Sequence, residues 1–175
     1  MDNNKIYDNV INDLEALEIM AKELAERFPP LGAAISEKIY FENSSLHVLI
    51  ISQLEYFLKG VGKIKEQWEL VQVINSSKVL TPKEKAHLKY MFFTRHCVVH
   101  NGAHFDDKFL KNMKKITEID VEKPKNDQLS VIEPFLLVTY INLVKKLMNE
   151  IKDELGIEYN DWRKTEVRKL KSLYK

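Results

Sequence analysis

The sequence predicts an all-α protein: a bundle of four principal helices with short extra helices and one irregular loop region. Apolar residues recur at spacings of three and four along several long segments. Residue types that cap or interrupt helices stand at the ends of those segments. Five glycines and five prolines among 175 residues leave little chain for long irregular loops.

The composition fits one domain with its own core, which we place at residues 1–160, followed by a basic helix or tail over 161–175. The chain carries 27 Lys and Arg against 26 Asp and Glu, so it does not bind nucleic acid through bulk charge alone. The single cysteine, Cys97, excludes an intrachain disulfide. A polar N-terminus and short apolar runs predict a cytoplasmic protein without a membrane partner.

The first predicted helix covers residues 5–28 and ends at Pro29-Pro30, because proline cannot continue a helix. Its core-facing residues are Ile6, Val10, Leu14, Leu17, either Met20 or Ala21, Leu24 and Phe28. A short helix over 32–40 is expected to follow.

Asn43-Ser44-Ser45 are the predicted N-caps of a helix over 46–58. This segment is apolar on nearly all sides, which predicts a central position in the bundle. Gly60 and Gly62 weaken the helix, and a continuation to residue 74 is expected.

The Thr81-Pro82-Lys83-Glu84 segment is a capping box with proline at the first helical position. The helix that starts there extends to Val99 and ends at Asn101-Gly102. Residues 103–130 predict a loop region with a hairpin and a helical turn or two over 109–115. The last long helix runs from 130 or 131 to 155 and is closed by Gly156.

Chemistry is concentrated in Arg95-His96-Cys97-Val98-Val99-His100-Asn101, and three of the five histidines, including His104, lie within nine residues. One interpretation is a packed helix end with Cys97 as a small buried hydrophobe. A second is a metal site, which the adjacent arginine disfavours and which lacks a carboxylate or second cysteine at the usual spacing. We therefore expect neither a metal nor another cofactor.

The third interpretation is phosphodiester chemistry on RNA. A histidine can take a proton from a ribose 2′-hydroxyl or give one to the leaving 5′-oxygen. Arginine presents a planar fork to the phosphate oxygens as negative charge builds up. Residues five apart on a helix lie about 140° apart around its axis, so Arg95 and His100 do not share one face. They can converge if His100 lies where the helix ends, or if two copies of the motif meet across a two-fold axis and share one phosphate. A site that needs two motifs requires a homodimer.

The motif resembles the Arg-x(4–6)-His signature of HEPN domains, a superfamily of prokaryotic and eukaryotic nucleotide-binding domains. The run from His100 to Leu110 is similar to the sequence after that motif in the bacterial RiboL-PSP-HEPN-like branch, and the run from Leu49 to Lys59 resembles an earlier helix of the same branch. The resemblance spans roughly residues 44–111.

The resemblance implies an all-α bundle, a homodimer and a metal-independent endoribonuclease, with toxin–antitoxin or anti-phage abortive-infection systems as the setting and an antitoxin or sensor protein as a further partner. Arg95 and His100 would be catalytic, and His96, Asn101 and Glu55 would support them. Some members are inactive modules that bind RNA or nucleotides or that dimerise. A tyrosine that one toxin subgroup carries two residues after the histidine is replaced here by Gly102, so modification of that tyrosine does not apply.

The sequence allows two interpretations of Glu55 and two of the basic C-terminal tail. Glu55 either points to solvent or is buried and paired with Arg95, because an unpaired buried carboxylate is costly. The basic tail is either a solvated end or a guide for RNA. The candidate RNA-binding residues are Lys108, Arg163, Lys164 and Arg168.

Overall fold

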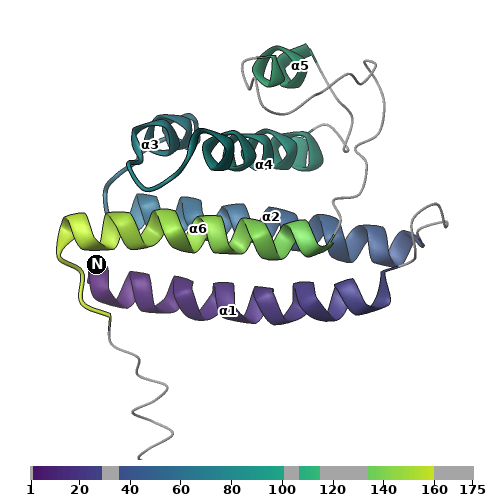
Figure 1. The fold of residues 1–175 in the computed structure, drawn as a ribbon, viewed down its shortest axis with the longest axis horizontal. Helices are drawn as coiled ribbons and strands as arrows, with labels where there is room; N and C mark the ends of the chain where they lie inside the picture. The colour runs from purple at the N-terminus through teal and green to yellow at the C-terminus, as the bar shows by residue number, and fades with distance from the viewer. Residues whose placement is uncertain (1, 29–35, 101–106, 115–133, 160–175) are drawn as a thin grey trace, which may run out of the picture.

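The computed structural model describes residues 2–28, 36–100, 107–114 and 134–159 (Figure 1). These residues form helices and connecting turns without a strand, which confirms the predicted all-α class. The elements are α1 Asn3–Arg27, α2 Glu37–Gly60, the 3-10 turn η1 Gln67–Glu69, α3 Leu70–Ser76, α4 Pro82–His100, α5 Asp107–Met113 and α6 Pro134–Leu155.

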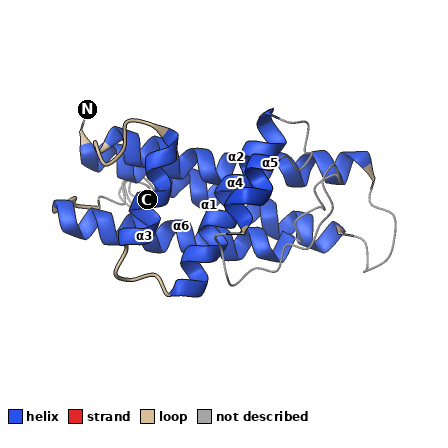
Figure 2. Ribbon diagram, turned by 90° about the horizontal axis from the view of Figure 1, so that it is seen from above, coloured by secondary structure: helices blue, strands red, loops and turns tan. Residues whose placement is uncertain are grey.

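The helices lie in layers, and α2 has a central position. α1 packs against α2 and α6, while α4 lies across the opposite side of these two helices (Figures 1 and 2). α3 and α5 both contact α4. Ile50, Ile51, Leu54, Phe57 and Leu58 of α2 are fully buried, so the predicted central role of this segment is confirmed.

α1 matches the predicted first helix closely. Asp2 caps it by accepting a hydrogen bond from the Asn4 amide at 3.0 Å. Of the two alternatives for the core-facing position, Ala21 is buried and Met20 is exposed.

The predicted start of α2 was wrong. Asn43, Ser44 and Ser45 lie inside the helix, and Asn43 is buried there. Ser36 is the actual cap, since its hydroxyl accepts a hydrogen bond from the Ile39 amide at 3.3 Å. Residues 37–40, predicted as part of a separate short helix, are the first turn of α2, and Ile39 packs against the core. Residues 29–35 lie outside the described part of the chain.

The predicted continuation of α2 to residue 74 was also wrong. Gly62 has a φ of 72°, a left-handed conformation that ends the helix, and the Lys63 amide bonds back to the Leu58 carbonyl at 2.9 Å. The chain then turns into η1 and α3.

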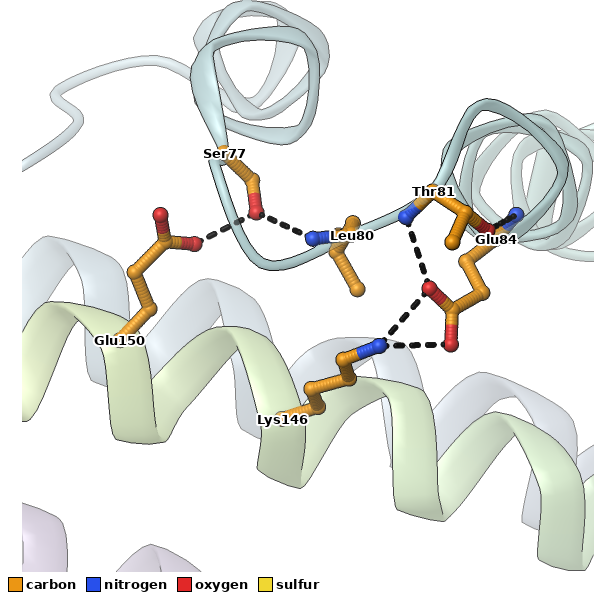
Figure 3. A network of polar contacts seen from close by, with 6 residues as sticks. All are labelled: Ser77, Leu80, Thr81, Glu84, Lys146 and Glu150. Atoms are coloured by element: carbon orange, nitrogen blue, oxygen red, sulfur yellow. Dashed lines mark hydrogen bonds and ion pairs between the residues drawn. The ribbon is translucent and has the colours of Figure 1, made fainter.

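The predicted capping box at the start of α4 is confirmed (Figure 3). The Thr81 amide donates to Glu84 at 2.7 Å, and the Glu84 amide donates to the Thr81 hydroxyl at 3.3 Å. Both oxygens of Glu84 accept from Lys146 of α6 at 2.8 Å. Ser77, in the preceding turn, donates to Glu150 of α6. These contacts fasten the start of α4 to the bundle.

The second half of the chain agrees with the sequence where it is described. α5 provides the helical turns expected near 109–115, and α6 ends before Gly156, whose φ is 62°. The predicted hairpin, the Asn101-Gly102 helix end, the predicted start of the last helix at 130 or 131, and the basic tail with Arg163, Lys164 and Arg168 lie outside the described residues. None of the described helices has the length and apolar character that crossing a membrane requires.

Replacing Thr81 by alanine tests the capping box. Thr81→Ala should lower the free energy of unfolding by about 1 kcal/mol, because the Glu84 amide loses its acceptor. Thr81→Ser keeps the hydroxyl and should retain most of the stability. Urea unfolding followed by circular dichroism measures both variants, and an unchanged Thr81→Ala protein would contradict the role given to this cap.

Candidate functional site

The motif occupies the last turns of α4, and its residues point in different directions. Cys97 is completely buried in a small cluster with Ala86 and Phe109, as expected of a small hydrophobe. The Arg95 side chain is only 12% exposed, whereas His100 is exposed. Asn101 and His104 lie outside the described residues.

Arg95 points toward α2 and pairs with Glu55. Its Nη2 atom lies 3.7 Å from Oε2 of Glu55, whose side chain is 7% exposed. The same oxygen accepts a hydrogen bond from the side-chain amide Nε2 of Gln67, in η1, at 2.8 Å. The interpretation of Glu55 as a buried partner of Arg95 is therefore confirmed. Nothing in the sequence pattern identified Gln67.

Three buried polar atoms around this pair have no hydrogen-bond partner within the described part of the chain. They are Oε1 of Glu55, Nε of Arg95 and Nδ1 of His47. Unsatisfied polar atoms are costly in a protein interior. Glu55 and Arg95 thus retain unused hydrogen-bonding capacity after their contact is made.

His47 is a buried neighbour that the sequence analysis did not identify. Its Nε2 lies 2.9 Å from the Met91 carbonyl of α4. A carbonyl only accepts, so Nε2 carries the proton and Nδ1 is left as an acceptor. Complete burial, together with the positive charge of Arg95, lowers the pKa of His47 to about 4. The imidazole is therefore neutral at physiological pH, and its hydrogen bond to Met91 links α2 to α4.

His96 and His100 form the second half of the site. Their ring centroids are 4.7 Å apart, as expected for residues one turn apart on the same helix face. Arg95 faces α2 while His100 is exposed, in keeping with the predicted angular separation of these two residues. The site of a single chain thus consists of a guanidinium held by a carboxylate and a neighbouring pair of imidazoles.

A pocket of about 770 Å³ adjoins the motif. One wall is a face of α4 formed by Lys89, Phe92, Phe93 and His96, which follow each other at helical spacing. The face continues to His100 at the helix end. The pocket and the histidine pair therefore lie along one strip of α4.

η1, α3 and α5 also contribute lining residues. Gln67, Trp68 and Asn75 contribute two amides and an indole that is 60% exposed. Phe109 and Asn112 come from α5. Two pocket residues connect to the motif: Gln67 bonds to Glu55, the partner of Arg95, and His96 is part of the motif and contacts His100.

Among the described residues, no group of three or more His, Cys, Asp or Glu is arranged to hold a metal ion. His104, which the metal interpretation would include, lies outside that part of the chain. The Lys108 side chain also lies outside it. Comparison of the chain with protein-family models, curated proteins and solved structures finds no match.

A double-variant comparison tests the Glu55–Arg95 pair. Arg95→Met should lower the free energy of unfolding by about 3 kcal/mol or more, because it leaves a buried carboxylate without its cation. Adding Glu55→Leu should recover much of this loss, because the unpaired charge disappears. Lys22→Met, which breaks the exposed pair with Glu18, should cost about 0.5 kcal/mol or less. A double variant less stable than Arg95→Met would refute the pairing.

The burial of His47 predicts a pH-dependent stability. The unfolded chain binds a proton at this residue near pH 6.5, while the folded chain resists protonation down to about pH 4. Stability should therefore fall as the pH is lowered through this window, by about 3 kcal/mol in total from this group. His47→Gln should flatten the dependence in urea unfolding at several pH values. Equal slopes for wild type and His47→Gln would contradict the assignment.

Proposed function

We propose that the chain is a HEPN-type, metal-independent endoribonuclease that acts as a homodimer, with Arg95 and His100 as catalytic residues and His96, Asn101 and Glu55 in support. The resemblance of residues 44–111 to such domains suggests a role in toxin or anti-phage systems, with an antitoxin or sensor protein as a further partner. The pairing of Glu55 with Arg95 beside the His96–His100 contact is the observation that carries the proposal.

The chemistry uses the substrate's own nucleophile. A histidine takes the proton of the ribose 2′-hydroxyl, the 2′-oxygen attacks phosphorus, and the bond from phosphorus to the 5′-oxygen breaks. A second histidine, from the same or the partner copy, returns a proton to the 5′-oxygen. The products are a 2′,3′-cyclic phosphate and a 5′-hydroxyl. Arg95 stabilises the added negative charge on the phosphate oxygens.

Two features support a homodimer. Arg95 and His100 lie on different sides of α4, so a second copy can supply the missing partner for each. An apolar groove of about 520 Å³ runs beside the motif, lined by residues that include Phe41, Leu49 and Val98. Phe41 is 72% exposed, and Leu49 and the neighbouring Val99 are also exposed, as expected of a surface that a second copy covers.

One observation favours the rival function, a non-catalytic module that binds RNA or nucleotides or dimerises. Arg95 already has a partner in Glu55 and is largely buried, which would suit a purely structural arginine. Such a module would keep its binding and its dimer after Arg95 and His100 are both replaced.

The nuclease is tested with total RNA in EDTA. Wild type should cleave it and leave 2′,3′-cyclic phosphate ends, whereas Arg95→Lys and His100→Ala should each reduce the rate by about a hundredfold or more, because a positioned acid–base or charge-stabilising group is lost. Arg27→Lys and His87→Ala, which change the same residue types elsewhere, serve as matched controls. Light scattering should give the mass of two chains.

Mixing Arg95→Lys with His100→Ala separates a shared site from a single-chain site. If the two residues act across the dimer, a mixed dimer contains one intact site, and re-equilibrated mixtures should regain about a quarter of the wild-type rate. No gain would place both residues of a site in one chain. If dimeric wild type cleaves no RNA, the non-catalytic binding module is favoured instead. If EDTA abolishes cleavage and added zinc restores it, the metal-free mechanism is wrong.

A further inference from the structure

We propose that the pocket between α4, α3 and α5 binds one unpaired nucleotide of a single-stranded RNA next to the phosphate held at the motif. Identifying RNA as the source of this nucleotide rests on the proposed function. The pocket itself is defined by residues outside the Arg95–His100 motif, apart from His96.

The walls of the pocket suit the face of a base. Phe92 and Phe93 of α4 and Trp68 of η1 all line the pocket, and the Trp68 side chain is 60% exposed. With most of its surface in water, the Trp68 indole is available to stack on a ligand that enters the pocket. Stacking on aromatic rings accepts any base, because every base has a flat π-face.

The polar groups of the pocket suit the edge of a base. Gln67, Asn75 and Asn112 come from three different elements and surround the same space. Side-chain amides carry donors and an acceptor, the combination that reads base edges, and Gln67 keeps one donor and its oxygen after its bond to Glu55. In a duplex these edges are already paired, so the pocket selects an unpaired nucleotide.

The charges at the pocket suit a phosphate backbone. Lys59 of α2 and Lys89 of α4 both line it. The acid that also lines it, Glu66, is engaged in the capping box that starts η1. Positive side chains beside an aromatic surface are the combination that single-stranded nucleic acids require.

The position of the pocket links it to the motif. Gln67 bonds to Glu55, which pairs with Arg95, and His96 contacts His100. A nucleotide that fills the pocket therefore contacts residues joined directly to both halves of the motif. We infer that it orients the neighbouring phosphate toward Arg95.

Binding is measured with a short 2′-O-methyl oligoribonucleotide, which lacks the attacking hydroxyl and cannot be cleaved by the proposed chemistry. The fluorescence anisotropy of a labelled oligonucleotide should show that Trp68→Ala binds about tenfold more weakly or worse, the scale of one lost stacking contact. Trp68→Phe keeps an aromatic face and should stay within about threefold of wild type. Tyr56→Ala, which removes another exposed aromatic side chain that does not line this pocket, should bind like wild type.

A second readout reports on the pocket directly. Trp68 and Trp162 are the only tryptophans of the sequence, so Trp162→Phe leaves Trp68 as the sole indole. Its emission should be quenched as the unlabelled single-stranded oligonucleotide binds and should not respond to the same sequence in a duplex. Unchanged affinity in Trp68→Ala, no quenching at saturation, or equal quenching by the duplex would each overturn the proposal.

The source of the nucleotide is tested with mononucleotides. An RNA subsite is supported if the oligonucleotide quenches Trp68 at concentrations at which the four nucleoside monophosphates have no effect. If only the mononucleotides quench Trp68, the RNA subsite is refuted and the pocket binds a free nucleotide. These measurements do not require cleavage. If the protein cuts no RNA but binds it through Trp68, the nuclease proposal is refuted and the pocket proposal is supported. If it cuts RNA and its binding does not depend on Trp68, the nuclease proposal is supported and the pocket proposal is refuted.

Discussion

The burial of the Glu55 carboxylate in the central helix is the constraint that organises this molecule. α2 is covered by α1, α6 and α4, so a charge on its inner surface cannot be solvated and must find partners in the protein. Arg95 of α4 and Gln67 of η1 supply them. One carboxylate thereby contacts two chain segments, and both segments contribute residues to the pocket.

The attachment of α4 at several points explains how one face of it is left for function. Glu84 fastens its start to Lys146, the Met91 carbonyl meets His47 at its middle, and Arg95 meets Glu55 near its end. Cys97 buries the side that α5 covers. The remaining face carries the pocket wall and the two contacting histidines, so a rigid helix presents them together.

Sequence reasoning succeeded where the signal is local and lost accuracy where tertiary contacts decide. The capping box at Thr81 and the periodicity of α1 depend on neighbours along the chain, and both were predicted. The start of α2 was misplaced because Asn43 has a cap's chemistry but is buried inside a longer helix. The Glu55–Arg95 pair could be anticipated, since a charged residue in an apolar helix demands a partner. Gln67, His47 and the pocket could not, because they depend on how α2, η1 and α4 approach one another.

The polar cluster is difficult to explain by stability alone. Buried ion pairs are often no more stabilising than apolar residues of similar size, and this pair lies 3.7 Å apart with Oε1 of Glu55 and Nε of Arg95 unsatisfied within the described part of the chain. Leucine and methionine at these two positions would give a fold of similar or greater stability. Under the proposed function, the carboxylate holds the guanidinium in place beside the histidines, and the exposed part of Arg95 meets the phosphate. In that proposal, the cost of burying the Glu55 carboxylate is offset by function, because the carboxylate orients Arg95 before the substrate binds.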